Sequence, residues 1–581
     1  MIDRRPAAGT FAAFALISVL FSPFSGPGAL AADPTPADAD LAYHHAPIHY
    51  QDTDSTNARA DFISAFSYDG NFDAEDNWDH LELFQQFAHA YHSVVETCTH
   101  YFIDYGFFHP RDWTDSSFDQ EHENDMEGLL AVVRKPAGAT DPPLGRLEAL
   151  VTVFHTDFYS YTPADSPLVG KYEDIDGTVT LQSFNGSGHP LTAQQSKGHG
   201  LKVWPYIDDF TGAEDQDGVI YFPTGAGEVP GSGNDREVGY GLISFFDAGG
   251  LWERQILESG RSRDASLSFA SWGHFKGNES GGCGDGITVT CSTDSASPPW
   301  GWDDGDDGPT FAGEMALDPA HLVDMYFDHG AGGGSFGQAY VRNRYLEDLR
   351  TAGYTSAFLP RGMSGSLDLD AMYAKLVGLD GDADGLESCA EISLGTDPKD
   401  ADSDDDGLLD GLEVLSLGTD PLQQDSDGDG IDDGDEDADG DGVSNADEIE
   451  QGTDPASGDS DGDGLPDGLD RDPTVADRDG DGLVDGRDVE FVQTAVAGLP
   501  SDSFIPAGGG TQHAIESVLE DVESLLLVGD VNGALRKLMD LRRRLDGCGT
   551  RPDRNDWILD CAAQVSIRSL IDLLVTNLGG A

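Results

Sequence analysis

The sequence predicts a multidomain protein with a mainly β sandwich N-terminal domain, an irregular Ca²⁺-binding repeat array and a small α-helical C-terminal domain. Three observations predict this order. Short apolar runs separated by turn residues fill the N-terminal half, acidic repeats occupy residues 380–490, and apolar residues spaced three and four apart follow them. The chain has 581 residues, which is enough for several domains of ordinary size.

The charge of the chain excludes some classes of partner. It carries 108 acidic and 32 basic residues, a formal net charge of −76. Nucleic acid is not expected as a partner, because binding to phosphates requires a basic face. An anionic membrane surface is disfavoured for the same reason unless a cation bridges the two. The hydrophobic content of 38% is still that of a globular protein.

Residues 1–31 are expected to be a signal peptide. Arg4 and Arg5 precede an apolar run at residues 11–21, and Ala29 and Ala31 suit a cleavage site. An uncleaved anchor is the alternative, although the run is shorter than the ~20 residues of a membrane span. Later segments are not apolar enough to span a bilayer. We therefore expect no transmembrane segment in a mature protein that is secreted or at the cell surface.

Residues 41–345 are expected to form the β-rich domain. They are rich in aromatic residues and glycine, and they contain β-like runs at 93–108, 128–134, 147–158 and 201–207. Turn residues separate these runs, so we expect an antiparallel arrangement with long loops.

The strongest pattern lies in residues 380–490. Six copies of Asp-x-Asp-x-Asp-Gly occur there, and each has an aliphatic residue at position 7 and a carboxylate at position 12. This is the spacing of a Ca²⁺-binding loop. Carboxylates at positions 1, 3 and 5 meet at one point only if the chain turns sharply after them, and glycine at position 6 permits that turn. Ligands that are all oxygen favour Ca²⁺ over zinc or copper.

The expected Ca²⁺ ligands are the carboxylates at positions 1, 3, 5 and 12 of the six copies. They are Asp380, Asp382, Asp384 and Glu391; Asp402, Asp404, Asp406 and Glu413; Asp425, Asp427, Asp429 and Glu436; Asp437, Asp439, Asp441 and Glu448; Asp459, Asp461, Asp463 and Asp470; and Asp477, Asp479, Asp481 and Asp488.

The composition of the array implies that it needs metal in order to fold. Residues 380–490 hold 33 Asp and 7 Glu against 1 Lys and 3 Arg, a net charge of −36. Such a segment lacks the apolar residues for a core, and without cations it should repel itself into a disordered chain. A solvated acidic linker is the competing interpretation, but it would not keep glycine and carboxylate in the same register six times.

These loops resemble thrombospondin type 3 repeats of secreted bacterial proteins. The spacer Leu-Gly-Thr-Asp-Pro occurs at 394–398 and 417–421, and Gln-Gly-Thr-Asp-Pro occurs at 451–455. The resemblance implies that the array wraps several Ca²⁺ ions into a compact stalk with little regular secondary structure. Dockerin modules use similar loops, but they have two repeats, each followed by a longer helix.

A second candidate metal site lies in the segment His122-Glu123-Asn124-Asp125-Met126-Glu127. In a strand, Asp125 and Glu127 project to the same side, and His122 can fold over to the same point. Such a cluster can hold a further divalent cation. A solvated acidic turn is the alternative. His155 and His199 are expected to be structural rather than ligands.

The same segment resembles the necrosis-inducing protein family, which are secreted β-sandwich cytolysins, and related vacuolar-sorting-type β domains. That family has a Gly-His-Arg-His-Asp-Trp-Glu heptad, and its first His, its Asp and its Glu bind a metal. The resemblance implies this role for His122, Asp125 and Glu127. Glu121, Asn124 and Met126 are among the positions that depart from the heptad.

Two functions are compatible with these patterns. The first is a secreted calcium-binding protein, whose repeats form a Ca²⁺-stabilised stalk that carries a β-rich domain for surface binding or adhesion. Its partner would be an extracellular glycan, lipid or protein. The alternative is a secreted metal-dependent hydrolase or cytolysin centred on His122, Asp125 and Glu127. A Walker loop and a His-Glu-x-x-His motif are not found in the sequence, and its Ser and His residues are too many and too scattered to nominate a triad, so catalytic residues stay unassigned and enzymatic activity stays open.

The remaining segments are expected to be helical. Residues 346–379 form a short connector, and residues 491–581 form a bundle. Ile515, Leu519 and Leu526 share one helical face, and Leu538 and Leu541 share a face of a second helix after a break at 529–530.

The six cysteines indicate an oxidising compartment. Cys283 and Cys291 are close enough in sequence to join a hairpin, and a Cys548–Cys561 disulfide would clip the helical bundle. Cys98 and Cys389 either pair with each other or stay as buried thiols.

Overall fold

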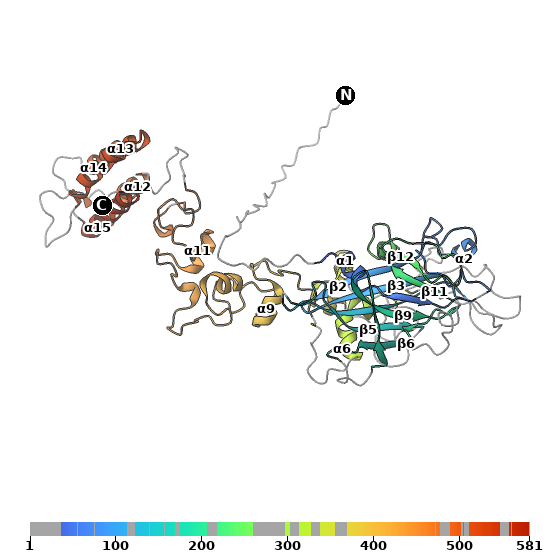
Figure 1. The fold of residues 1–581 in the computed structure, drawn as a ribbon. Coiled ribbons are helices and arrows are strands. Elements are labelled where there is room, and N and C mark those ends of the chain that lie inside the picture. The colour runs from blue at the N-terminus through green and yellow to red at the C-terminus, as the bar shows by residue number, and fades with distance from the viewer. Residues whose placement is uncertain are drawn as a thin grey trace, which may run out of the picture. The chain divides into compact units, whose positions relative to one another are not determined.

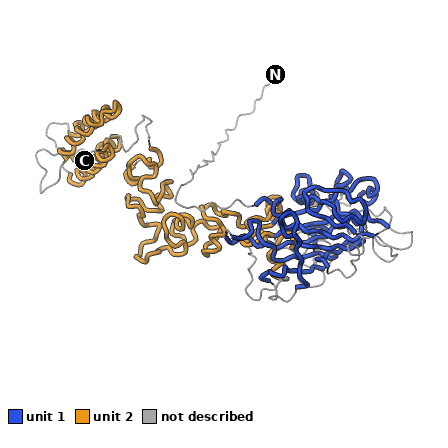
Figure 2. The backbone as a smooth tube through the Cα atoms, in the orientation of Figure 1, with its two compact units in different colours: residues 1–94, 102–309 blue, residues 95–101, 310–581 orange. Residues whose placement is uncertain are grey.

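The computed structural model describes residues 36–579 except 55, 75, 113–121, 139, 156, 169–174, 206–217, 260–296, 303–312, 327–336, 338, 355–368, 471, 477–488, 501–502, 505–510, 546–556 and 559. The chain divides into two compact units (Figure 2). Unit 1 comprises residues 1–94 and 102–309, and unit 2 comprises residues 95–101 and 310–581. The predicted signal peptide lies outside the described residues. A helix with the length and apolarity needed to cross a membrane is not found in the described ranges.

Unit 1 contains most of the strands, and the ends of β2 and β3 continue into unit 2 (Figure 1). The strands are β1 (Ile48–Gln51), β2 (His89–Thr97), β3 (His100–Asp112), β4 (His122–Arg134), β5 (Arg146–Phe154), β6 (Asp157–Pro163), β7 (Gly177–Val179), β8 (Leu181–Phe184), β9 (Ser187–Gln194), β10 (Leu201–Val203), β11 (Val219–Pro223) and β12 (Val238–Ser244). Three helices accompany them: α1 (Asp38–His45), α2 (Asn77–His80) and α4 (Leu251–Ser259).

Unit 2 is mostly helix and loop. Its elements are α5 (Glu314–Leu317), α6 (Pro319–Tyr326), β13 (Tyr340–Arg342), α7 (Arg344–Thr351), α8 (Leu369–Tyr373), α9 (Ser388–Leu394), α10 (Asp410–Leu412), η1 (Glu413–Leu417), η2 (Asp433–Asp435), α11 (Asn445–Gln451), η3 (Asp467–Leu469), α12 (Glu490–Gly498), α13 (Thr511–Leu527), α14 (Val531–Arg542) and α15 (Cys561–Asn577). The predicted β-rich N-terminal region and helical C-terminal region are confirmed.

The strands form one continuous sheet path in the order β10-β9-β1-β11-β12-β2-β3-β4-β5-β6-β7. β10, at one end of this path, contacts β4 and β5, so the sheet curls almost into a barrel. The division into the two sheets of the predicted sandwich stays a prediction.

The expected antiparallel arrangement is wrong for four pairings. β1 pairs with β9, β11 with β12, β12 with β2, and β6 with β7 in the parallel sense. Parallel neighbours require a crossover connection rather than a tight turn. β1 and β9, and β2 and β12, are far apart in sequence, whereas β6 with β7 and β11 with β12 are consecutive strands whose connections are longer than a tight turn. Local sequence patterns do not reveal such pairings.

The central strands are buried on both faces. β3 is buried at every position from His100 to Pro110. Its aromatic and aliphatic side chains are therefore covered by other parts of the protein on both faces of the sheet. Phe245 lies against Tyr91 at 5.2 Å and against Trp300 at 5.4 Å between ring centroids. A consequence is that every polar side chain on these strands must find a partner inside the protein.

The strand β4 carries a local irregularity that matters for the candidate site. Asn124 has a φ of 63°, a left-handed conformation that asparagine tolerates better than most residues. Its buried amide donates to the carbonyl of Ala74 at 2.7 Å and accepts from Nδ2 of Asn77 at 2.6 Å. These bonds hold the strand in place immediately before Asp125.

The C-terminal helices pack as the apolar spacing predicts. Ile515, Leu519 and Leu526 of α13 and Leu538 and Leu541 of α14 are buried in one hydrophobic cluster, which α12 and α15 complete. The predicted break at 529–530 is present. Gly529 has a φ of 76°, and Asp530 caps α14 by accepting the backbone N–H of Gly533 at 2.9 Å.

A disulfide joins Cys98 to Cys389, which resolves the alternative that the sequence left open. Cys561 is also disulfide-bonded. Cys283, Cys291 and Cys548 lie outside the described residues, so the two other predicted pairings stay predictions.

Acid should destabilise unit 1 through His49. Burial lowers the pKa of His49 to about 4, so the unfolded chain binds one more proton than the folded chain between pH 4 and the usual value near 6.5. Stability is therefore lost as the pH falls through this window, by about 1.4 kcal/mol per pH unit from this residue. We expect His49→Gln to reduce the slope of unfolding free energy against pH between pH 6.5 and 4.5. His89→Gln, a change to a half-buried histidine, serves as the control; equal slopes for all three proteins would contradict the assignment.

Candidate functional site

The acidic loops of unit 2 close on themselves in a repeated way. In copies 2 to 5 the position 1 carboxylate accepts the backbone N–H groups of positions 5 and 6. In copy 4, for example, Asp437 accepts from Asp441 at 3.1 Å and from Gly442 at 3.0 Å. The glycine at position 6 has a φ between 94° and 104° in all five copies described. Glycine is the residue that adopts this conformation without strain, so the predicted turn is present.

Position 9 has a role that the sequence analysis did not assign. In copy 2 the Asp410 N–H donates to the Ala401 carbonyl at 2.9 Å, and the Asp410 carboxylate accepts the Ser403 N–H at 2.8 Å. Copies 3, 4 and 5 repeat the side-chain bond at 3.0, 3.0 and 2.9 Å. The recurrence of Asp or Asn at position 9 was the signal for this closure.

The recurring Gly-Thr-Asp-Pro spacer binds the loop that follows it. The N–H of its aspartate donates to the serine hydroxyl at position 2 of the next copy. The bonds are Asp397 to Ser403 at 3.0 Å, Asp420 to Ser426 at 2.8 Å, and Asp454 to Ser460 at 2.7 Å. The spacer is therefore part of the folded array.

The case for a cation rests on positions 3 and 12. In copies 1, 2, 4 and 5, each of these carboxylates has at least one buried oxygen without a hydrogen-bond partner among the described residues. They are Asp382, Glu391, Asp404, Glu413, Asp439, Glu448, Asp461 and Asp470. A buried carboxylate oxygen without a donor is costly, and such oxygens are the ligands that Ca²⁺ prefers. The residues present therefore fit the metal that the repeats imply.

The electrostatics of position 12 agree with this reading. Burial, followed by repulsion from neighbouring aspartates, raises the pKa of Glu413 to about 8 and the pKa values of Glu391 and Glu448 to about 7. Crowded carboxylates retain protons when no positive charge is near. A divalent ion would remove this cost by supplying the opposite charge.

Neighbouring loops also bring ligands together. The carboxylates of Asp380, Asp382 and Asp384 have oxygens within 4.8 Å of one another, and so do those of positions 1, 3 and 5 in copy 2. A further group joins Asp384 and Glu391 of copy 1 to Asp410 of copy 2, all three buried. Position 9 of one loop thus adds an oxygen beside the site of the previous loop.

Copy 3 differs from the other copies at position 7, and copy 6 is not described. In copy 3 the aliphatic residue at position 7, Ile431, is 47% exposed, although an aliphatic side chain would be expected to pack inward. In copies 1, 2 and 5 position 7 is buried, as Leu386, Leu408 and Leu465. Copy 6, with its predicted ligands Asp477, Asp479, Asp481 and Asp488, lies outside the described residues.

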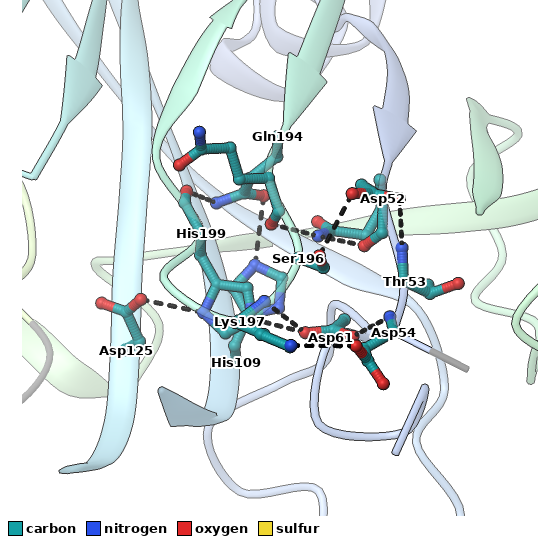
Figure 3. Close-up of polar contacts among 12 residues, drawn as sticks. Asp52, Thr53, Asp54, Asp61, His109, Asp125, Gln194, Ser196, Lys197 and His199 are labelled. Atoms are coloured by element: carbon teal, nitrogen blue, oxygen red, sulfur yellow. Dashed lines mark hydrogen bonds and ion pairs between the residues drawn. The ribbon is translucent and has the colours of Figure 1, made fainter. Parts of the chain in front are cut away.

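In unit 1, Asp125 is held by an ion pair with His199. His199 Nδ1 lies 2.9 Å from Asp125 Oδ2, and its Nε2 lies 3.3 Å from Asp61 Oδ1 (Figure 3). Burial alone would lower the pKa of His199, but the two carboxylates raise it to about 10. The ring is therefore an imidazolium between two aspartates, and it fixes the orientation of the Asp125 carboxylate.

The loop between β9 and β10 presents His199 to this position. Gln194, at the end of β9, donates to the His199 carbonyl at 2.6 Å, and its Oε1 lies 3.1 Å from Nε2 of His109 (Figure 3). The His109 ring stacks on His199 with centroids 3.8 Å apart. Burial, together with the nearby His199 charge, lowers the pKa of His109, so the stacked partner stays neutral.

Glu127 is held differently from Asp125. Its Oε1 accepts the backbone N–H of His155 at 2.9 Å and lies 3.3 Å from the Nδ1 of the same residue. Its Oε2 is buried and has no hydrogen-bond partner in the part of the chain that the structure describes. The Glu127 carboxylate raises the pKa of His155. One acceptor oxygen of Glu127 thus remains for a cation.

The predicted site is therefore partly assembled. Asp125 and Glu127 are both buried in β4, and each is oriented by a histidine. His155 and His199 contact the predicted ligands Glu127 and Asp125, and their role is to orient these carboxylates. They approach from loops that are distant in sequence, so the sequence alone does not indicate this role. His122 begins β4, but its side chain lies outside the description, so its role as a ligand stays a prediction.

Two further groups of side chains have metal-like spacing without any signal in the sequence analysis. Asp69, Asp76 and His80 form one in unit 1. Glu314, Asp318 and His321 form the other in unit 2, where Asp318 already binds the Tyr340 hydroxyl and Lys375.

Comparisons with known proteins agree with the repeat assignment. The family described as "Bacterial TSP3 repeat" matches residues 402–424 and 437–457, so the predicted resemblance is confirmed over these copies. A comparison with curated proteins finds no significant match.

Solved structures with some likeness to the chain have titles that name a toxin fold, NLP proteins and a necrosis-inducing protein, and residues 121–127 resemble the last of these families. "Toxin fold for microbial attack and plant defense" is 16% identical over 37% of this chain and 76% of that one, with a TM-score of 0.19. "NLPPya in complex with mannosamine" is 17% identical over 37% and 76%, with a TM-score of 0.18. "Necrosis and Ethylene inducing Protein 2 from the causal agent of cocoa's Witches Broom disease" is 12% identical over 30% and 58%, with a TM-score of 0.14.

The position 6 turn can be tested by adding one methyl group. A Cβ at Gly442 would meet no atom within 4 Å, so Gly442→Ala adds only the strain of a left-handed φ of 104°. That strain is of order 1–3 kcal/mol. We expect the Ca²⁺ affinity of one site to fall about tenfold or more, measured by competition with a fluorescent chelator.

Gly498→Ala is the matched control, because Gly498 ends α12 with a helical φ and open space around it. This change should leave Ca²⁺ affinity unaltered. Equal affinities for the two variants would contradict the proposed loop geometry.

Proposed function

We propose that the chain is an extracellular calcium-binding protein whose repeat array folds around several Ca²⁺ ions. One observation carries the proposal: position 3 and position 12 carboxylates of four copies hold buried oxygens without hydrogen-bond donors in the described segments. Water or protein donors satisfy such oxygens in ordinary acidic loops. A repeated set of buried carboxylate oxygens without donors among the described residues is suited to a hard cation.

The Ca²⁺ ions would be held by the carboxylates at positions 1, 3, 5 and 12, with position 9 of the following loop contributing where the copies adjoin. Bound Ca²⁺ supplies positive charge and several oxygen ligand positions. The chain itself supplies the position 6 turn, the closure through position 9, and the spacer bonds. Together these would convert a self-repelling acidic segment into a stiff stalk.

An extracellular setting is part of the proposal. Cys98, Cys389 and Cys561 are disulfide-bonded, which is typical of an oxidising compartment. The predicted signal peptide and the millimolar Ca²⁺ that weak extracellular sites use are consistent with this location. In this setting the β-rich domain of unit 1 would bind a surface glycan, lipid or protein, and the array would serve as its spacer.

Removal of Ca²⁺ should expand the array. We expect a chelator to increase the radius of gyration of the full chain in small-angle scattering at physiological salt, because the net charge of −36 in residues 380–490 is then no longer neutralised. Added Ca²⁺ should restore the compact form, whereas Mg²⁺ at the same concentration should do so less completely.

A chain with Glu391→Gln, Glu413→Gln and Glu448→Gln provides the comparison for this experiment. It should stay expanded at Ca²⁺ concentrations that compact the unaltered chain. An unaltered chain that takes up no Ca²⁺, or whose radius does not respond to the chelator, would refute the proposal.

A second candidate function is a metal-dependent cytolysin or hydrolase centred in unit 1. The buried Oε2 of Glu127, without a hydrogen-bond partner among the described residues, favours it, because it lies two residues from the oriented Asp125. A cation there would be held by Asp125 and Glu127, with His122 as the third predicted ligand. His199 and His155 would orient the two carboxylates, as outer partners of metal ligands commonly do.

Neutral isosteres distinguish the two functions of unit 1. Asp125→Asn with Glu127→Gln should abolish cell lysis or hydrolysis under the second function and leave adhesion to a target surface intact under the first. Asp104→Asn is the control, because Asp104 is buried with a strongly raised pKa and is already neutral beside Ser93. Lysis or hydrolysis that survives the double change would remove the second function.

A further inference from the structure

Successive loops of the array meet through position 10. Its backbone N–H donates to the position 5 carboxylate of the preceding copy in three places. The pairs are Gly411 with Asp384 at 2.7 Å, Gly434 with Asp406 at 3.1 Å, and Gly468 with Asp441 at 2.7 Å. A Cβ at these glycines would lie 2.4, 2.2 and 2.7 Å from the carbonyl oxygen of the same aspartates. Glycine is therefore required where one loop rests on the previous one.

The first copy has no earlier copy to rest on, and its position 10 is a cysteine. Cys389 forms a disulfide with Cys98, which lies in the turn between β2 and β3. Both cysteines belong to unit 2. The disulfide thus occupies the place in the first loop where later loops have their contact with the preceding copy.

The position of Cys389 connects this bond to a Ca²⁺ ligand. Cys389 is the second residue of α9, and Glu391 lies two residues further on in the same short helix. Both carboxylate oxygens of Glu391 are buried without hydrogen-bond partners in the described parts of the chain. The start of α9 also contacts its own loop, because the Ser388 N–H donates to the Leu379 carbonyl at 2.8 Å. Fixing α9 therefore fixes Glu391.

We infer that the Cys98–Cys389 disulfide anchors the first loop in place of a preceding repeat, and that it makes the Ca²⁺ affinity of this loop sensitive to redox state. The inference rests on the proposed function, since it requires the first loop to bind Ca²⁺. With the bond intact, Glu391 is positioned before the ion arrives. With the bond broken, Ca²⁺ must order α9 as it binds, and the affinity falls.

The redox step is an exchange with a dithiol reductant. One thiolate of the dithiol attacks a sulfur of the Cys98–Cys389 bond, forms a mixed disulfide and releases the other cysteine as a thiolate. The second thiol of the reductant then displaces the remaining cysteine. The protein gains two electrons and two protons as two thiols, and the dithiol becomes a cyclic disulfide.

A double-mutant cycle on the full chain tests the coupling. Cys98→Ser with Cys389→Ser removes the bond without leaving a free thiol, and Glu391→Gln removes the ligand. We expect the serine pair to weaken one Ca²⁺ site about tenfold, measured by chelator competition, since partners that orient a metal ligand have effects of this size. Within the Glu391→Gln background the serine pair should have no further effect on Ca²⁺ binding.

Glu448→Gln is the matched control, because it removes the equivalent ligand in copy 4, away from the disulfide. Its effect should add to that of the serine pair. Treatment of the unaltered chain with a dithiol should reproduce the weakened site, and reoxidation should restore it. Far-ultraviolet circular dichroism of the serine variant, unchanged from the parent, shows that the fold survives.

The outcomes separate the two claims. A parent chain that binds no Ca²⁺ refutes the proposed function. A parent chain that binds Ca²⁺ with the same affinities as the folded serine variant refutes the disulfide inference alone. An effect of the serine pair that is equally large in the Glu391→Gln background also refutes it, because the bond would then act elsewhere.

Discussion

The organisation of this protein depends on one electrostatic constraint, which is the burial of carboxylates with at least one oxygen that has no hydrogen-bond donor among the described residues. In the repeat array the constraint is repeated along the chain, and Glu391, Glu413 and Glu448 are fully buried. Such groups persist in a fold only if positive charge reaches them. In unit 1 an internal cation does so for Asp125, namely the imidazolium of His199. In the array the nearby side chains are themselves acidic, and under the proposed function bound Ca²⁺ ions would supply the charge.

The array also illustrates how a segment without a hydrophobic core can specify a structure. The described loops use their polar groups in a recurring order. Position 1 closes the turn and position 9 closes the loop in copies 2 to 5, and position 5 of copies 1, 2 and 4 accepts a hydrogen bond from the next loop. The spacer aspartate and the serine at position 2 then set the path between copies, as Asp454 and Ser460 do. Apolar residues contribute at position 7, where Leu408 and Leu465 are buried. Directional hydrogen bonds therefore set the path of this segment, where packing does so in most folds.

Unit 1 differs from the array, because it has a hydrophobic core in which polar side chains are buried. Its central strands are buried on both faces, so the polar side chains there lie away from solvent and depend on partners within the protein. Asp61, His199 and Asp125 form one such chain of ion pairs, and the stacked His109 is kept neutral beside it. The same burial that stabilises the sheet therefore preorganises Asp125 and Glu127. The candidate site and the core therefore share residues, so we expect substitutions at Asp125 or Glu127 to affect both.

The sequence determined the features that depend on neighbours along the chain. The Asp-x-Asp-x-Asp-Gly turn, the break at 529–530 and the helical faces of α13 and α14 follow from local spacing, because their bonds and contacts span only a few residues. Tertiary structure decided the rest. Several contacts join residues that are far apart in sequence. They are parallel pairings such as β1 with β9, the ion pair of His199 with Asp125, the position of Asp410 beside the ligands of the previous loop, and the Cys98–Cys389 bond. A distant partner leaves no periodic signal in the sequence, since it depends on how the whole chain closes rather than on the residues beside it.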